Sequence, residues 1–453
     1  MILTRVILLG IFLSFYSSAW AVTYYVDGNS GNNNNPGISR NVALKTIQKA
    51  SDKMVPGDQC FVLTGTYEER IRITTSGSSN HPILYQADGQ VITQGFTIDA
   101  SYVHIIGFEI TNTIDHPTDG TGITVSGSYC EIRSNYIHDV TRAGIFLWAP
   151  TRDSENTSHC IISGNQIFRA GQTGVEINGR NHLVENNDIS HTLQHPPKLL
   201  SPFYGMDADG IRFFGSGHII QRNKIYDITL NDPENVDPHI DCFQTWGPAY
   251  QITFEQNFCE NLDDGMQGWM IGELESPVQD FVIKNNVVKA FRLLNVFNAE
   301  DMVIVNNSFK SELSYRLPSG YGIELHHSPN AKIINNLFYD VGRHEFPYLY
   351  ADSPSLTGLD VGYNCHFMSD QNLPYGNPYS NDLWQIDPKL ANISGNDFHL
   401  QRGSPLINAG ITLSEMTDDF DGISRPPGSG NDIGAFNYQS VTISTPQGLR
   451  VVQ

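Results

Sequence analysis

Charged side chains recur at one place in the chain, one residue before each of four consecutive short apolar strands. Counted along the sequence, that position reads Asp209, Asp241, Asp264 and Arg292. A single aspartate before glycine is typical of a turn, but carboxylates stacked on neighbouring strands repel one another. A Ca²⁺ ion held by carboxylate oxygens offsets that repulsion, and so does an active site whose carboxylates titrate at different pH. The row therefore predicts a site.

Further reactive side chains flank this row. Asp207, His239 and Asp263 lie within two residues of it. As metal ligands we predict Asp209, Asp241, Asp263 and Asp264. As catalytic groups we predict Arg292, His239, Asp241 and Asp264.

The strands that follow the row set which side chains face outward. They read GIFLW, GVEIN, GIRFF, CFQTW, GMQGW, LLNVF and GIELH. Because side chains alternate between the two faces of a strand, the inward set is Ile145, Val175, Ile211, Phe243, Met266, Leu294 and Ile323. From the outward set we predict substrate contacts by Trp148, Arg212, Phe214, Gln244, Trp246, Gln267 and Trp269. Exposed aromatic rings suit sugar faces; the alternative is that loops between the strands cover them.

An asparagine returns at one place in a repeated phrase of two short apolar strands. The asparagines are Asn135, Asn165, Asn187, Asn223, Asn257, Asn286, Asn307 and Asn336. The shortest intervals, 22 residues from 165 to 187 and 21 from 286 to 307, match one coil of a parallel β-helix, in which buried amides stack and hydrogen-bond. An antiparallel sandwich would show hairpin turn pairs instead. We predict an all-β, right-handed, single-stranded parallel β-helix.

The ends of the chain predict its domain organisation. Residues 1–21, with Arg5 before an apolar run and Ala19-Trp20-Ala21 after it, are typical of a signal peptide. Residues 22–385 are predicted as the β-helix, which an amphipathic helix within 41–54 caps at its N-terminal end. Residues 386–439 are predicted as an irregular C-terminal cap and 440–453 as a polar tail. The mature protein is expected to be secreted or periplasmic.

Composition limits the partners. The chain has 27 basic and 48 acidic residues, a net charge of −21, and no basic stripe, which argues against a nucleic-acid partner. We expect no membrane span and a monomer. The six cysteines show no Cys-x-x-Cys spacing. Cys130 and Cys160 each precede a ladder asparagine by five residues and are expected to stack, which leaves a disulfide between them open.

Three stretches resemble the secreted parallel β-helix superfamily that contains pectate lyases. The opening YYVDGNSGNNNNPG and the closing DFDGISRPPGSGNDIGAF are similar to the usual ends of such chains. The stretch from HIDCFQ to LDDGMQ is similar to the site of family 9 pectate lyases. There, aspartates on neighbouring coils bind Ca²⁺ and a lysine is the base. The resemblance gives metal positions to Asp241, Asp263 and Asp264. Gln267 stands where the family has an aspartate, and Arg292 stands in the lysine position.

Three functions follow from these residues. The first is a calcium-dependent lyase for an acidic, pectate-like polysaccharide, in which Arg292 is the base, or binds the uronate carboxylate while His239 takes the proton. The second is a glycoside hydrolase that uses the aspartates as an acid and base pair. The third is a cell-surface glycan binder without turnover. Glu324 is a reserve candidate for acid chemistry, whereas His326 and His327, on a late strand and the turn after it, are expected to be solvated or bonded to a loop rather than to act as ligands.

Overall fold

A computed structural model describes residues 21–113, 120–192, 208–228, 240–262, 267–272, 278–311, 321–342, 347–370, 372–425 and 430–439. The predicted signal peptide and tail lie outside these ranges, apart from Ala21, so both remain predictions. No helix in the described ranges is long and apolar enough to cross a membrane.

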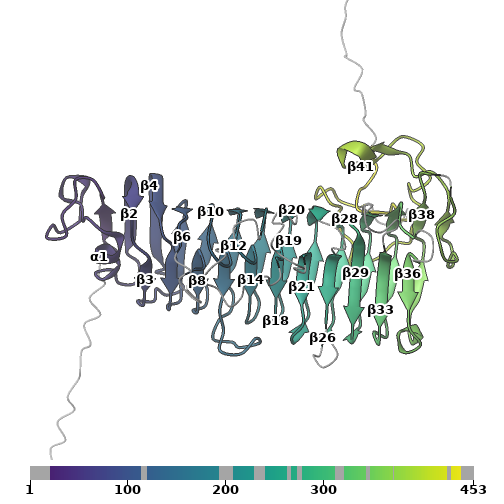
Figure 1. The fold of residues 1–453 in the computed structure, drawn as a ribbon, viewed down its shortest axis with the longest axis horizontal. Coiled ribbons are helices and arrows are strands. Elements are labelled where there is room, and N and C mark those ends of the chain that lie inside the picture. The colour runs from purple at the N-terminus through teal and green to yellow at the C-terminus, as the bar shows by residue number, and fades with distance from the viewer. Residues whose placement is uncertain are drawn as a thin grey trace, which may run out of the picture.

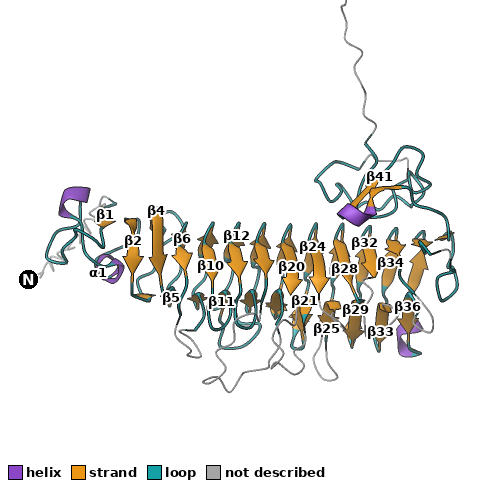
Figure 2. Ribbon diagram, turned by 45° about the horizontal axis from the view of Figure 1, so that its top comes forward, coloured by secondary structure: helices purple, strands orange, loops and turns teal. Residues whose placement is uncertain are grey.

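The chain coils around one long axis, and successive coils add parallel strands to the same sheets (Figures 1 and 2). One sheet, called the site sheet here, has eleven strands: β3 (Ile71–Ile73), β5 (Phe96–Ile98), β8 (Ile123–Val125), β11 (Ile145–Leu147), β14 (Val175–Ile177), β17 (Ile211–Phe213), β21 (Asp241–Thr245), β25 (Gln267–Ile271), β29 (Arg292–Phe297), β33 (Tyr321–His326) and β36 (Leu349–Ala351). A short sheet follows it, with β18 (Gly215–Ser216), β22 (Ala249–Tyr250), β26 (Val278–Gln279) and β30 (Ala299–Glu300).

The largest sheet contains two series of strands that meet at the asparagine turn. The first series is β1 (Thr23–Val26), β2 (Gln59–Tyr67), β4 (Ile83–Thr93), β6 (Val103–Ile106), β9 (Glu131–Arg133), β12 (Ile161–Ser163), β15 (Leu183–Glu185), β19 (Ile219–Gln221), β23 (Thr253–Glu255), β27 (Val282–Lys284), β31 (Val303–Val305), β34 (Lys332–Ile334) and β37 (Asp360–Gly362). The second is β7 (Glu109–Ile110), β10 (Tyr136–His138), β13 (Gln166–Phe168), β16 (Asp188–Ser190), β20 (Lys224–Ile228), β24 (Phe258–Leu262), β28 (Val287–Ala290), β32 (Ser308–Ser311), β35 (Leu337–Tyr339), β38 (Cys365–Phe367) and β39 (Leu383–Trp384).

The asparagine ladder makes the turn between these two series. From Asn135 to Asn364, each side-chain Nδ2 donates to the Oδ1 of the next asparagine at 2.9–3.1 Å. The residue before each of them adopts a positive φ between 52° and 64°, as at Ser134 and Tyr363. That conformation bends the chain sharply at the same place in every coil. The predicted ladder is confirmed, and it extends one rung further, to Asn364.

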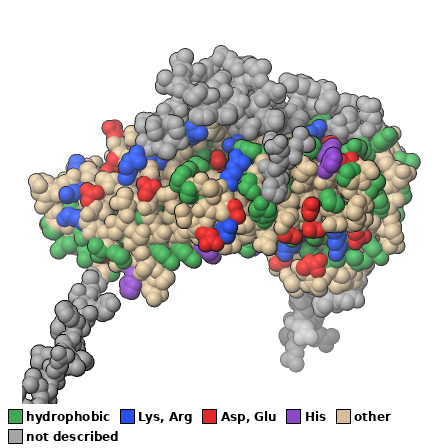
Figure 3. Space-filling view, turned by 90° about the horizontal axis from the view of Figure 1, so that it is seen from below, with side chains coloured by type: hydrophobic (Ala, Val, Ile, Leu, Met, Phe, Trp, Pro, Cys, Tyr) green, Lys and Arg blue, Asp and Glu red, His purple; other side chains and the backbone are tan. Residues whose placement is uncertain are grey.

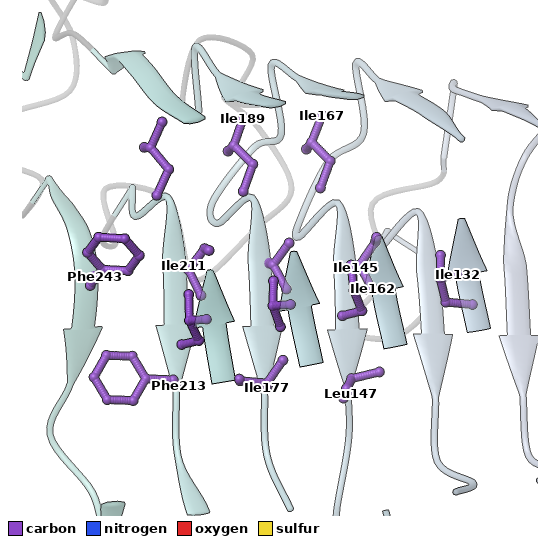
Figure 4. Close-up of a cluster of buried hydrophobic side chains, with 14 of the residues drawn as sticks. Ile132, Ile145, Leu147, Ile162, Ile167, Ile177, Ile189, Ile211, Phe213 and Phe243 are labelled. Carbon is purple, nitrogen blue, oxygen red and sulfur yellow. The ribbon is translucent and has the colours of Figure 1, made fainter. Parts of the chain in front are cut away.

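Aliphatic and aromatic side chains from the site sheet and from both strand series of the largest sheet fill the interior. Figure 4 shows the stacked isoleucines, with Ile145, Ile211 and Phe243 in one file and Ile132 with Ile162 in another. All five are fully buried. Stacking identical positions buries apolar surface continuously along the axis, which stabilises coils that are too short to fold alone.

The two ends differ. At the N-terminal end, η1 (Arg40–Val42) precedes α1 (Ile47–Ser51), whose Ile47 and Ala50 are buried in the core. The expected helix is therefore present but short. The C-terminal segment holds η3 (Ile393–Gly395), β40 (Leu390–Asn392) and β41 (Asp397–Leu400).

This segment packs along the side of the later coils rather than across their end (Figure 1). Side-chain amides of the asparagine turn hold it there, since Gln256 donates to the carbonyl of Asp419 and Asn306 to that of Asp432. A last short helix, η2 (Pro354–Leu356), follows β36.

The disulfide in the structure joins other cysteines than the two that the sequence spacing singled out. Cys242 on β21 and Cys259 on β24 form a disulfide, which links two sides of one coil. Cys130 and Cys160 are buried thiols that precede the paired residues Glu131 and Ile161 on neighbouring coils, and their Sγ atoms donate to the carbonyls of Ala100 and Gly127. Their predicted stacking is confirmed, and the disulfide that was left open there does not form. The bridge instead fixes the strand that carries Asp241.

Candidate functional site

Strand register sets the row of side chains at the start of the site strands. Asp241 pairs with Gln267, and Gln267 pairs with Arg292. Gln267 therefore occupies the position that we predicted for Asp264. Asp263, Asp264 and His239 lie outside the described residues, so the roles predicted for them stay predictions.

The register also corrects the predicted faces of β25. Trp269 pairs with Phe243 and Leu294, is fully buried, and stacks on Phe243 with the ring centroids 5.0 Å apart. Its predicted outward position is wrong, whereas Met266, which was predicted to face inward, lies outside the described residues. The strand is offset by three residues from our alignment, and an odd offset exchanges the two faces. Burial of the large indole in the core favours this register over one that exposes it.

The two described aspartates of the row are both fully buried. Asp209 accepts hydrogen bonds from Nε and Nη2 of Arg212 at 2.9 and 2.7 Å. Nη1 of Arg212 also lies 3.6 Å from a carboxylate oxygen of Glu176. The Arg212 guanidinium therefore compensates the acidic charge at this end of the row. The sequence had predicted that a calcium ion would do so.

The predicted aromatic row is divided between exposed and covered rings. Trp148 is 45% exposed. Phe214 is buried, because the Arg152 guanidinium lies 3.8 Å from its ring centroid and Trp246 packs against it edge-on at 4.9 Å. Arg212 lies 4.8 Å from the Trp246 ring. For Phe214, the alternative that a loop covers the ring is confirmed.

Oxygen atoms of three amides lie along neighbouring site strands. Gln244, Gln267 and Asn295 are buried, and the side-chain oxygen of each has no hydrogen-bond partner among the described residues. A buried acceptor without a partner is costly, so such atoms point to a bound group or water. Carboxylate and amide oxygens are also the atoms that Ca²⁺ prefers. However, no three His, Cys, Asp or Glu side chains gather as a metal site within the described ranges. The described residues thus do not make a calcium site by themselves.

A second charged cluster lies on β29 and β33, and sequence reasoning undervalued it. Nε of Arg292 lies 3.2 Å from Oε1 of Glu324, and Oε2 of Glu324 lies 3.6 Å from Nε2 of His326. These side chains are 27%, 13% and 25% exposed, whereas Asp209 and Asp241 are fully buried. We call Arg292, Glu324 and His326 the Arg292 cluster.

Aromatic rings border the Arg292 cluster. The His326 ring stacks on Phe297 with centroids 4.6 Å apart, and Tyr350 packs on its other side at 5.2 Å. Tyr350 is 43% exposed. Figure 3, seen from below, shows acidic and basic side chains interspersed with hydrophobic ones on one face of the molecule. The signal that could have found the cluster is the pairing of GIELH with RLLNVF, two strands that follow each other in the site sheet.

Comparisons with known protein families agree with the observed fold. A family described as "Right handed beta helix region" matches residues 153–364, and one described as "Protein of unknown function (DUF1565)" matches residues 73–201. The chain therefore has the fold of a right-handed parallel β-helix.

Solved structures share this fold, and the following two are similar along nearly the whole chain. Pectate lyase Pel9A is 19% identical, with 93% of this chain and 97% of that chain covered and a TM-score of 0.55. XylC, solved in complex with xylose, is 13% identical, with coverages of 92% and 99% and a TM-score of 0.54. A search among proteins with curated descriptions found no match.

Proposed function

We propose that this protein is a secreted lyase that cleaves a uronate-containing polysaccharide, pectate-like by preference, by β-elimination. The observation that carries the proposal is the Arg292 cluster, in which the Glu324 carboxylate lies 3.2 Å from the Arg292 guanidinium and 3.6 Å from the His326 imidazole, and all three side chains reach solvent. The fold shared with pectate lyase Pel9A supports the class of substrate.

Arg292 suits binding of the uronate carboxylate better than proton abstraction. A guanidinium presents five N–H donors in a plane and has no acceptor atom, and it matches a carboxylate in two parallel hydrogen bonds. Its Nε already faces Glu324, so the guanidinium is held in place before substrate arrives. Neutralising the uronate carboxylate makes the neighbouring C5 proton more acidic.

Glu324 and His326 supply the proton transfers in this proposal. A carboxylate oxygen of Glu324 accepts the C5 proton, and the electron pair of that C–H bond forms the C4–C5 double bond. The C4–O bond then breaks, and His326 donates a proton to the leaving oxygen. The 3.6 Å between Glu324 and His326 allows the proton to return to His326 after release of the product.

Calcium dependence and His239 remain part of the proposal. Asp241 would hold the ion together with Asp263 and Asp264. These two aspartates and His239, the other candidate base, lie outside the described residues. No step above depends on the ion.

The test is ultraviolet absorbance of the unsaturated product on a panel of acidic polysaccharides. We expect wild-type protein to produce it, and Glu324→Gln to lower the rate by about 10²-fold or more. A second test variant is His326→Asn, and its matched control is His327→Asn. His327 neighbours His326 in the chain, but its side chain is 63% exposed and pairs with Asp352. Only His326→Asn should lose activity. New reducing ends without absorbance would instead favour a hydrolase, and glycan binding without either signal a non-catalytic binder.

A further inference from the structure

A hollow of about 220 Å³ lies on the largest sheet, over the strands β10, β13, β16 and β20. None of these strands belongs to the site sheet that carries the Arg292 cluster. Six of the side chains that line the hollow are Tyr136, Gln166, Phe168, Asp188, Ser190 and Tyr226. We call it the second groove.

The register arranges these side chains in two rows along the axis of the molecule. One row contains Tyr136, Gln166 and Asp188, and the other contains Phe168, Ser190 and Tyr226. Neighbouring strands of a sheet are about 4.8 Å apart. The groove therefore offers a ring or a polar group at regular intervals, which suits an extended chain of repeating units.

The chemistry of the lining matches that of a sugar. Sugar rings combine apolar C–H faces with a rim of hydroxyls. The aromatic rings of the groove offer surfaces for the former, and its amide, carboxylate and hydroxyl groups offer hydrogen bonds for the latter. Tyr136 is 39% exposed, so its ring is accessible.

Charge favours an uncharged ligand. Asp188 is the one charged side chain among the residues that line the groove. Lys224, which could attract an acidic sugar, lies with Nζ 4.1 Å from the Tyr226 ring centroid. In the register Lys224 lies directly beside Asp188, so the two charges offset each other and the groove has no net charge that would attract an anionic unit.

Contacts within the protein hold the lining side chains in place before a ligand binds. The Tyr226 hydroxyl donates a hydrogen bond to the Asp188 carboxylate and also bonds to Ser190, and burial together with the bond to Asp188 raises the pKa of Tyr226. The Tyr136 ring stacks on His138 with centroids 4.4 Å apart. Phe168 packs between His191 at 4.9 Å and the Arg169 guanidinium at 5.2 Å. Side chains fixed in advance lose little entropy on binding.

We propose that the second groove binds a neutral stretch of a glycan chain laid along the axis of the β-helix. This binding is independent of the chemistry at the Arg292 cluster. It would hold the protein on a polysaccharide that contains neutral segments while cleavage occurs on the other sheet.

The test is titration calorimetry with neutral oligosaccharides derived from xylan, galactan and glucomannan, and with oligogalacturonate for comparison. Wild-type protein should bind at least one neutral oligosaccharide, and Tyr136→Ala should weaken that binding about tenfold, because a lost ring contact of this size corresponds to about 1.4 kcal/mol. The control is Tyr129→Ala, a tyrosine of similar exposure, 43%, outside the groove. It should bind as wild type does.

Failure of the second groove is distinguishable from failure of the proposed lyase. Glu324→Gln should lose lyase activity and keep neutral-glycan binding. Tyr136→Ala should lose neutral-glycan binding and keep lyase activity on short acidic substrates. Absence of neutral binding to wild type, unchanged binding to Tyr136→Ala, or binding here of oligogalacturonate alone would each overturn the proposal.

Discussion

The asparagine ladder gives the prediction whose magnitude the structure fixes best. In the middle of the ladder, the Asn223 side chain takes part in four hydrogen bonds. Its Oδ1 accepts from the backbone N and the Nδ2 of Asn187, at 3.1 and 2.9 Å. Its Nδ2 donates to the carbonyl of Val184 and to Oδ1 of Asn257, at 2.9 and 3.1 Å. All three partner residues, Asn187, Val184 and Asn257, are buried.

Substitution Asn223→Ala removes all four bonds at a site where water has no access. Each is worth about 1 kcal/mol net, and two buried donors on Asn187 lose their acceptor, at a further cost. We therefore expect a loss of about 4–6 kcal/mol in the free energy of unfolding. The same change at Asn135, the first rung, removes fewer bonds, because Oδ1 there accepts only from the backbone of Phe108. Its expected cost is about 3 kcal/mol.

Urea unfolding, followed by circular dichroism, measures both variants against wild type. Amide hydrogen exchange adds a local readout, because the backbone N–H of Asn187 should lose protection in Asn223→Ala but not in Asn135→Ala. A loss below about 1 kcal/mol at Asn223, or equal losses at the two positions, would refute the argument that the ladder is energetically cumulative.

Three further predictions concern stability. Burial lowers the pKa of His218 from 6.5 to about 4, so the unfolded chain binds a proton that the folded chain does not. The free energy of unfolding should therefore fall as the pH drops from about 6.5 to about 4, by about 3 kcal/mol, and urea titrations of His218→Gln should lack that part of the decrease. Trp269→Ala should cost about 3–5 kcal/mol in urea unfolding, whereas Trp148→Ala at the surface should cost under about 0.5 kcal/mol; equal losses would contradict the corrected register. Cys242→Ser with Cys259→Ser should cost about 3 kcal/mol in thermal or urea unfolding, from a loop with a sequence separation of 17, and an unchanged midpoint would show that the bridge does not stabilise the fold.

The fold was predictable because its signal is periodic. A buried amide that must hydrogen-bond to its neighbours returns once per coil, and Asn165 and Asn187 reveal that period directly. The strand faces followed from alternation, except on β25. There, Gly265 and Gly268 offer similar starting points for alignment, and only the packing of Trp269 against Phe243 distinguishes them.

The candidate site was predicted less well, because contacts between coils are not visible in one strand. Asp209 looks like a metal ligand in sequence, yet Arg212, three residues later, binds it. Glu324 and His326 look like ordinary outward residues until the register brings them beside Arg292 on the previous coil. Disulfide pairing was hidden for the same reason, since Cys242 and Cys259 belong to strands on different sides of one coil.

The central claim, cleavage by elimination at the Arg292 cluster, is tested most directly by the mass of the products. Polygalacturonate would be digested in oxygen-labelled water, with calcium present and then with chelator, and the fragments analysed by mass spectrometry. Elimination predicts fragments with an unsaturated end, each lacking one water and carrying no label at the new reducing end; a loss of products with chelator would place Ca²⁺ in the reaction. Saturated fragments that carry the label would show hydrolysis and contradict the account.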